Sequence, residues 1–163
     1  MQPQITSYET LSPSSRVWIY QSSRPFSNME LPEIQTAIEN FAQQWVSHNR
    51  ALKAFAKVYH QRFIVLMVDE SQADATGCSI DSSVHFLQQL GAQLGVDLFD
   101  RMTFAWKDGE EVKVAPKSEF SRLYQEGKLT DETLVFDNLV KDKSGFENEW
   151  LKPLGKSWHR RMV

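Results

Sequence analysis

FIVLMV, residues 63–68, is the longest unbroken apolar run in this chain of 163 residues. Its length suits a strand and falls far short of the roughly 20 residues that a membrane-spanning helix needs. An apolar run without polar alternation is typical of a central strand that is covered on both faces. Residues 63–68 therefore predict a sheet in the middle of the fold, with other elements packed on both sides.

The segments on the N-terminal side of this run alternate between strand and helix patterns. Residues 16–21 (RVWIYQ) and 53–60 (KAFAKVYH) are rich in β-branched and aromatic residues or alternate with period two, so they predict strands. Residues 31–48 carry apolar side chains at helical spacing. Ser27 and Glu30 precede them at the spacing of a capping box, which predicts where this helix begins.

A second helix follows the apolar run, because Ser79 or Asp81 can cap it and Gly95 can end it. The order through Trp106 is then strand, helix, strand, strand, helix, strand. This order predicts a ferredoxin-like α+β sandwich over residues 15–100, with its first and third strands side by side and parallel. Such a sandwich has helices on one face only, so the FIVLMV strand needs a second cover, either the C-terminal third or another copy in a homodimer.

Composition narrows the classes of function. With 41% hydrophobic residues the chain can bury a core, and a net charge of -3 with scattered Lys and Arg argues against nucleic acid as a partner. A single cysteine cannot form an intramolecular disulfide, which favours the cytoplasm. No apolar run predicts a membrane span. Residues 1–14 lack a signal-peptide pattern and are expected to form a flexible polar tail.

The C-terminal third, residues 101–163, predicts a small ββαβ unit packed against the first. Its order of elements resembles the bacterial GYF-like domains, which combine an aromatic hairpin, a proline-containing turn, one helix and a TLV strand. The matching residues are Phe104, Trp106, Pro116, Ser118, Phe120, Leu123, Gly127, residues 133–135 and residues 150–153. The resemblance implies protein–protein interaction, often with proline-rich peptides held in an aromatic groove.

The whole chain also resembles an uncharacterised bacterial family whose members are sometimes labelled ABC transporter ATPase. The resemblance is carried by residues 77–86 (GCSIDSSVHF), 96–106 (VDLFDRMTFAW) and 157–162 (SWHRRM). An ATPase needs a Walker A loop, G-x-x-x-x-G-K-[ST], between a strand and a helix. The candidate Gly155-Lys156-Ser157 has Trp150 in place of the first glycine, so the ATPase interpretation is rejected.

A candidate ligand site arises if the loops that leave the first and third strands meet at one end of the sheet. Helix N-terminal amides together with a guanidinium would then suit a small anion. The residues that these loops supply are Ser22, Ser23, Arg24, Thr76, Gly77, Cys78, Ser79 and Asp81. The alternative is structural: Ser79 and Asp81 cap the helix, and Arg24 is a solvated loop residue.

Cys78 offers a chemical alternative, because a helix N-terminus can lower the pKa of a thiol. In that case the protein would be a small thiol-dependent enzyme with Arg24 as anion clamp; otherwise Cys78 is a buried or turn residue. The four histidines and one cysteine show no metal-ligand spacing, and no cofactor is expected. We therefore expect a non-enzymatic binding protein, which takes a protein partner through its C-terminal unit or an anion at the paired loops.

Overall fold

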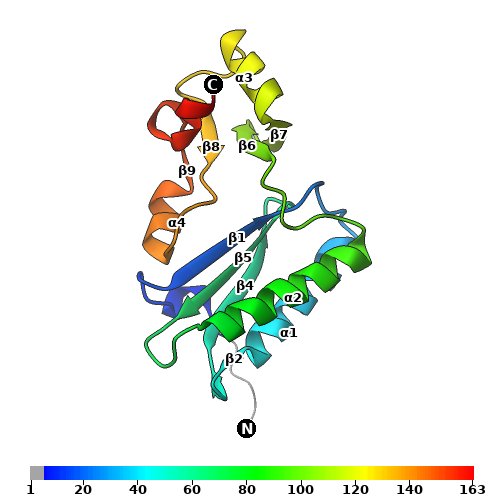
Figure 1. Ribbon diagram of the computed structural model, residues 1–163, viewed down its shortest axis with the longest axis vertical. Coiled ribbons are helices and arrows are strands. Elements are labelled where there is room, and N and C mark those ends of the chain that lie inside the picture. Colours follow the sequence, from blue (N-terminus) through cyan, green and yellow to red (C-terminus); the bar gives the residue numbers. More distant parts are fainter. Residues whose placement is uncertain (1–5) are drawn as a thin grey trace. The chain divides into compact units, whose positions relative to one another are not determined.

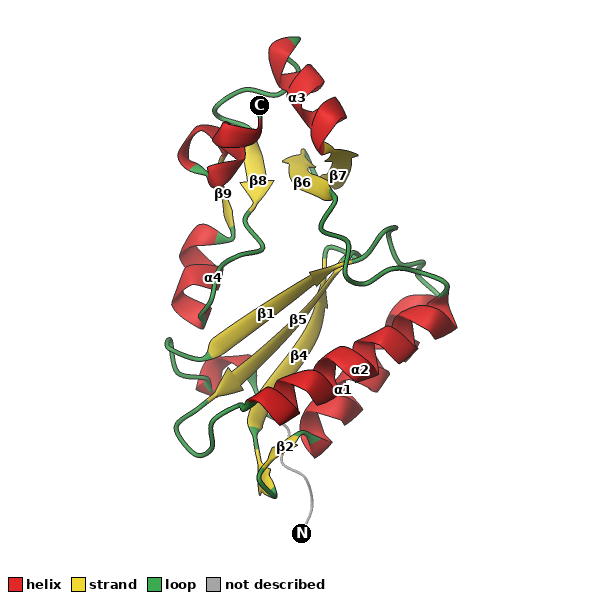
Figure 2. Ribbon diagram, viewed as in Figure 1, coloured by secondary structure: helices red, strands yellow, loops and turns green. Residues whose placement is uncertain are grey.

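The computed structural model describes residues 6–163, which form an α+β protein with antiparallel sheets (Figures 1 and 2). The predicted mixture of helices and strands is therefore confirmed. The chain divides into two compact units. Unit 1 consists of Met1–Asp100 with Lys141–Ser144, and unit 2 consists of Arg101–Val140 with Gly145–Val163.

The sheet of unit 1 has the strand order β1-β5-β4, formed by β1 (Arg16–Gln21), β4 (Lys53–Tyr59) and β5 (Phe63–Asp69). The first and third predicted strands are neighbours, but the expectation that they run parallel is wrong. Arg16 lies opposite Val68 and Gln21 opposite Phe63, so β1 and β5 are antiparallel. The reason is the three-residue connection after β4, residues 60–62, which reverses the chain into β5 and so makes β5 antiparallel to both of its neighbours.

Two helices, α1 (Glu30–Gln44) and α2 (Gly77–Leu94), lie over one face of this sheet, as Figure 2 shows. The core between helices and sheet is aliphatic and aromatic and includes Ile34, Ile38, Trp45, Leu66 and Leu87. The predicted capping pair at the start of α1 is confirmed. The Glu30 N–H donates to Ser27 Oγ at 3.2 Å, and the Ser27 N–H donates to Glu30 Oε1 at 2.8 Å.

The N-terminal segment differs from the flexible tail that the sequence suggested for residues 1–14. Residues 1–5 lie outside the described residues, but Tyr8–Thr10 form a 3-10 helix, η1, and Leu11 is buried. The Ser12 N–H donates to Asp69 Oδ2 at 2.9 Å, which ties this segment to the end of β5. Residues 6–14 therefore belong to unit 1, because they have an apolar anchor and a buried hydrogen-bond acceptor.

Strand β5 is buried at all seven positions within a single chain. Part of its second cover comes from η1, since the Tyr8 ring lies 5.5 Å from that of Phe55, which neighbours Met67 on this face. The buried Lys143 adds to this cover, because its ammonium donates to the carbonyls of Tyr8 and Leu11 at 2.9 and 3.0 Å. A second copy is not needed to bury the FIVLMV run, so that reason for a homodimer falls away.

The edge of β1 receives a segment from much later in the chain. The Val17 N–H donates to the Lys141 carbonyl at 2.9 Å, and Arg16 forms an isolated antiparallel bridge with Asp142. The last strand of the predicted order, which ends at Trp106, is not part of this sheet. Residues 103–106 belong to β6 (Thr103–Asp108) in the sheet of unit 2.

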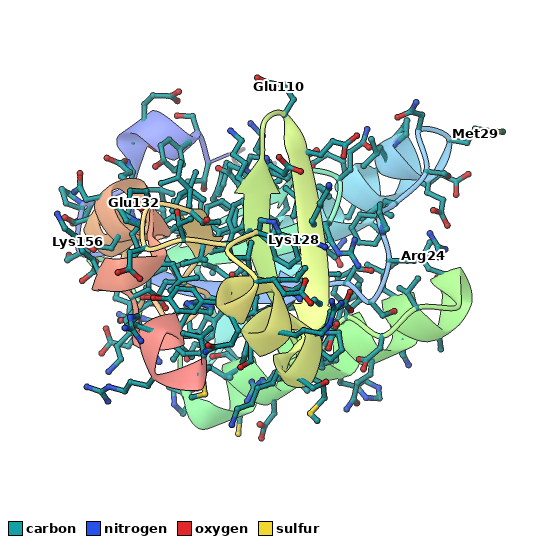
Figure 3. The ribbon with its side chains drawn as sticks, turned by 90° about the horizontal axis from the view of Figure 1, so that it is seen from above. Arg24, Met29, Glu110, Lys128, Glu132 and Lys156 are labelled. Atoms are coloured by element: carbon teal, nitrogen blue, oxygen red, sulfur yellow. The ribbon has the colours of Figure 1, made fainter. Side chains whose placement is uncertain are left out.

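Unit 2 contains a sheet of order β7-β6-β8-β9, with the bounds β6 (Thr103–Asp108), β7 (Glu111–Pro116), β8 (Leu134–Phe136) and β9 (Leu151–Pro153). Its helices are α3 (Lys117–Gln125), α4 (Lys143–Glu149), which begins in unit 1, and the 3-10 helices η2 (Leu154–Lys156) and η3 (Trp158–Met162). The turn between β6 and β7 uses Gly109 with a φ of 64°, and Glu110 extends outward there (Figure 3). A small two-stranded hairpin in unit 1, β2 (Val46–Ser47) and β3 (Arg50–Ala51), completes the elements.

Candidate functional site

The two loops that the sequence paired into an anion site lie at opposite ends of the unit 1 sheet. After β1, the Ser22 N–H bonds the carbonyl of Arg62 at the β4–β5 turn, and Arg24 Nη2 reaches the carbonyl of Leu94 at the end of α2. Thr76 is at the other end of α2, which is 18 residues long and hence about 27 Å. The eight predicted residues therefore do not form one pocket, because β1 and β5 are antiparallel.

Arg24 belongs to a structural clasp. Its guanidinium forms two hydrogen bonds of 2.9 Å with the Glu30 carboxylate and a third with the Leu94 carbonyl. The bonds from Arg24 lower the pKa of Glu30 to about 2, and the Ser27 N–H assists. Arg24 joins the β1 loop to both helices, so its predicted role as an anion clamp beside Cys78 is wrong.

The start of α2 is a complete helix cap. Thr76 is the N-cap, its side chain accepts from the Ser79 N–H, and Ser79 Oγ accepts from the Thr76 N–H at 2.7 Å. The prediction that Ser79 or Asp81 caps this helix is wrong, because the cap residue is Thr76 and Ser79 is the third residue of the helix, whose side chain completes the capping box. Cys78 and Asp81 are exposed, which contradicts the alternative of a buried cysteine.

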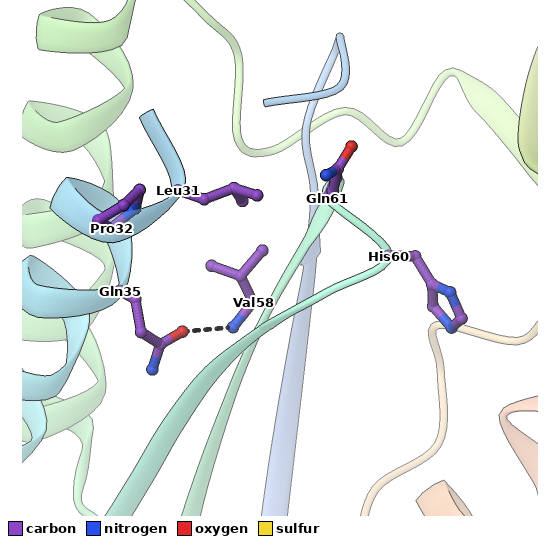
Figure 4. A pocket seen from close by; sticks show the side chains of 6 residues that line it. All are labelled: Leu31, Pro32, Gln35, Val58, His60 and Gln61. Atoms are coloured by element: carbon purple, nitrogen blue, oxygen red, sulfur yellow. Dashed lines mark hydrogen bonds between the residues drawn. The ribbon is translucent and has the colours of Figure 1, made fainter. Parts of the chain in front are cut away.

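A groove lies between α1 and the free edge of β4 in unit 1. It contains two partly open cavities, which we call the turn cavity and the alanine cavity. The turn cavity, about 440 Å³, is lined by Leu31, Pro32, Gln35, Val58, His60 and Gln61 (Figure 4). The alanine cavity, about 200 Å³, is lined by Thr6, Glu39, Ala42, Gln43, Ala54, Phe55 and Ala56. Together they form the edge groove.

Gln35 separates the two cavities by bonding the edge of β4. Its Oε1 accepts from the Val58 N–H at 3.0 Å (Figure 4), and its Nε2 donates to the Ala56 carbonyl at 3.1 Å. Through its second hydrogen, Nε2 also donates to Glu39 Oε1 at 2.7 Å. The carboxamide therefore makes with β4 one donor and one acceptor contact, as a backbone amide of a neighbouring strand would.

The turn that closes one end of the groove has a costly backbone. His60 and Gln61 adopt φ values of 54° and 56°, in the left-handed region that favours Gly or Asn. Gln61 Nε2 donates to Asn28 Oδ1 at 2.9 Å and so holds the turn beside the segment that precedes α1. The turn contributes Gln61 to the wall of the turn cavity, at a site where glycine would relieve the strain, whereas the imidazole of His60 points away from the other side chains drawn in Figure 4.

The remaining walls of the turn cavity are apolar. Leu31 and Val58 are half-buried and Pro32 is exposed. Met29, one residue before α1, is 87% exposed and points away from the molecule in Figure 3. An exposed methionine beside a cavity with aliphatic walls is typical of surfaces that bind apolar side chains.

The helix side of the groove carries negative charge. The sequence of α1, ELPEIQTAIENFAQQ, contains three glutamates and neither lysine nor arginine. Glu30 is paired with Arg24, whereas Glu39 lies on the wall of the alanine cavity. This end of the groove therefore favours a cationic group.

Comparison of the chain with family models, with curated proteins and with solved structures finds no match. The resemblance to GYF-like domains stays a prediction. Within residues 6–163, no helix has the length and apolar character to cross a membrane, and no three His, Cys, Asp or Glu side chains gather as metal ligands would. The sequence signal for the edge groove was present only in part, as the polar pair between two strands at residues 60–61.

Unit 2 contains an aromatic cluster around the half-buried Phe104. Its ring lies 5.2 Å from that of Phe120 and 5.7 Å from that of Trp158. Burial lowers the pKa of His159 to about 4, and its Nδ1 bonds Ser157 Oγ at 2.6 Å. The imidazole is therefore a neutral core group.

A second aromatic group lies on the surface of unit 2. The guanidinium of Arg160 lies over the ring of Tyr124 at 5.2 Å, and the Tyr124 hydroxyl donates to Asp131 at 2.8 Å. Trp158 is half-buried, and its Nε1 donates to the buried Asp137 at 2.8 Å. These rings are partly accessible, and each is held in place by a hydrogen bond.

Proposed function

We propose that this protein is a non-enzymatic binding protein and that it takes an apolar side chain of a protein partner in the turn cavity. The observation that carries the proposal is the strained turn at residues 60–61, which lines this cavity. Backbone strain persists where the surrounding structure over-determines it and is concentrated at functional sites. A turn chosen for stability alone would use Asn-Gly.

The chemistry of the turn cavity suits recognition. Leu31, Pro32 and Val58 supply apolar area, while Gln61 supplies hydrogen-bonding groups at the rim. Such a combination is typical of sites in which apolar contact gives affinity and a few polar groups fix orientation. An aliphatic or aromatic side chain of a partner matches this combination.

Site-specific photo-crosslinking tests the proposal. A benzophenone amino acid replaces Gln61 in the full chain, in cells of the source organism. A matched probe replaces Gln88, which is exposed on α2. We expect a discrete crosslinked partner from position 61 only, and its loss when Val58→Arg places a charged side chain in the cavity. Equal crosslinking from both positions, or persistence in the Val58→Arg chain, would contradict the proposal.

The C-terminal unit is a second candidate for binding a protein partner, as the sequence analysis expected. The half-buried rings of Phe104, Tyr124 and Trp158 favour it, because aromatic side chains with polar handles are frequent at interfaces. Probes placed at Lys128 and at Glu110 would test it. A partner captured from Lys128 but not from Glu110 would support this surface, and none from either would contradict it.

We also propose the finer assignments of fold and compartment. The order β1-β5-β4 with both helices on one face supports a ferredoxin-like unit 1. The hairpin, helix and third strand of unit 2 support a GYF-like unit. A cytoplasmic location stays a prediction that rests on the single cysteine. Superposing an experimental structure of unit 1 on ferredoxin-like domains, and one of unit 2 on GYF-like domains, would test each assignment of fold separately.

A further inference from the structure

We propose that the free edge of β4 receives an extended, lysine- or arginine-bearing peptide of the partner as an added strand, which displaces the Gln35 carboxamide. This inference rests on the proposed binding role of the turn cavity and extends it along the whole edge groove. It names the occupant by backbone conformation and by charge. Three observations support it: the outward backbone groups of β4, the bonds of Gln35, and the negative wall formed by α1.

The backbone of β4 presents hydrogen-bonding groups to the groove. Gln35 bonds the N–H of Val58 and the carbonyl of Ala56, so these two residues direct their backbone groups away from β5. Because orientation alternates along a strand, Ala54 directs its N–H and carbonyl the same way. Among the described residues, no hydrogen bond occupies the outward groups of Ala54. A partially unpaired edge of this kind is a template for another strand.

Gln35 already makes the contacts that a peptide backbone would make. Its side chain is flexible, and rotation about its χ angles frees both the Val58 N–H and the Ala56 carbonyl. An added strand would replace two side-chain bonds by a continuous ladder along Ala54, Ala56 and Val58. In strand addition, main-chain bonds of this type give affinity and side-chain pockets give specificity.

The two cavities fix the side chains that the peptide must carry. Val58 lines the turn cavity and Ala54 lines the alanine cavity. These positions are four residues apart, or about 13 Å along a strand. If a peptide places an apolar residue at the turn cavity, the residue that lies at the alanine cavity is therefore four positions away along the peptide, in one direction or the other. Glu39 lies there, and because α1 has no basic residue to pair with it, a lysine or arginine of the peptide is the complementary group.

The test uses a defined probe, an acetylated and amidated peptide of seven residues, made of threonines with one valine and, four positions later, one lysine. Nuclear magnetic resonance titration of the full chain measures its affinity, expected on the order of 1 mM for so short a segment. Hydrogen exchange measures protection of the Ala54 and Ala56 amides. We expect protection of both amides on binding, and about tenfold tighter binding by Gln35→Ala, because the peptide then displaces no hydrogen bond. Gln44→Ala, at an exposed position of the same helix, should bind as the unchanged protein does.

Charge and backbone pairing have their own controls. Glu39→Gln should weaken binding about threefold and remove its salt dependence, as expected for an exposed ion pair. A probe with proline in place of the central threonine should not bind, because proline lacks a backbone donor.

The outcomes separate this inference from the proposed function. No binding by the unchanged protein and by Gln35→Ala would overturn strand addition, while crosslinking at position 61 would still stand. Binding that is unaffected when the valine of the probe becomes glycine would contradict the turn cavity and leave strand addition in place. Binding without protection of the Ala54 and Ala56 amides would also overturn strand addition.

Discussion

Replacing His60 and Gln61 by Asn and Gly should stabilise the protein. Both residues adopt left-handed backbone conformations, with φ values of 54° and 56°, and such a conformation costs an L-residue about 1 kcal/mol or more. The double replacement relieves about 2 kcal/mol of this cost. Two effects offset roughly 1 kcal/mol of this gain: glycine adds conformational freedom to the unfolded chain, and the Gln61–Asn28 hydrogen bond is lost. The net gain is about 1 kcal/mol, which raises Tm by roughly 2–4 °C for a chain of this size.

Thermal and urea unfolding followed by circular dichroism would measure this gain. The hairpin between β2 and β3 supplies a matched control, because His48 and Asn49 have φ values of 51° and 64° and line neither cavity. Replacing His48-Asn49 by Asn-Gly should give a stability gain of the same sign. A probe at Met29 should lose its crosslinked partner only in the residue 60–61 variant. A stability loss in both variants would refute the argument from strain, and unchanged crosslinking would show that the turn is not kept for binding.

Three further changes should alter stability. Burial holds the pKa of His159 at about 4 against a usual value of 6.5. As the pH falls, the unfolded chain therefore binds a proton before the folded chain does, and the free energy of unfolding should fall by about 3 kcal/mol between pH 6.5 and 4. His159→Phe should flatten this part of the pH profile of unfolding. Gly91→Ala should destabilise the protein, because its Cβ would lie 2.9 Å from the Val96 carbonyl oxygen, whereas Gly77→Ala has open space and should be neutral or stabilising in the same thermal assay. Lys143→Met should cost about 2 kcal/mol in urea unfolding, since it leaves two carbonyls of the N-terminal segment without their donor; an unchanged midpoint would show that this lysine does not hold the segment.

The sequence predicted much of unit 1 because its signals are local. The unbroken apolar run of residues 63–68 gave a strand buried on both faces, and the Ser27–Glu30 spacing gave the start of α1. The relative direction of β1 and β5 was missed, although the short turn at residues 60–61 contains that information. Helix α1 returns the chain parallel to β1, and the three-residue connection at residues 60–62 then reverses it.

The candidate site was much less predictable. Arg24 and Thr76 were expected to lie together because the two strands before them were expected to be parallel. Since these strands are antiparallel, the two groups of predicted site residues lie at opposite ends of the sheet. The edge groove depends on Gln35, whose side chain bonds Ala56 and Val58 across 21 and 23 residues of sequence. A glutamine on an amphipathic helix has no local pattern that distinguishes this role from solvation.

The segment Lys141–Ser144 has a consequence for synthesis on the ribosome. Unit 1 is complete only when this segment reaches the edge of β1 and Lys143 bonds the N-terminal residues. When Asp100 has been made, residues 101–144 are still to come, and at about 5–20 residues per second their translation takes roughly 2–9 s. During those seconds the nascent first unit has an open β1 edge and an N-terminal segment without its ammonium anchor. A chaperone that binds extended edges has that interval in which to act, and a chain stalled before residue 141 keeps the edge open.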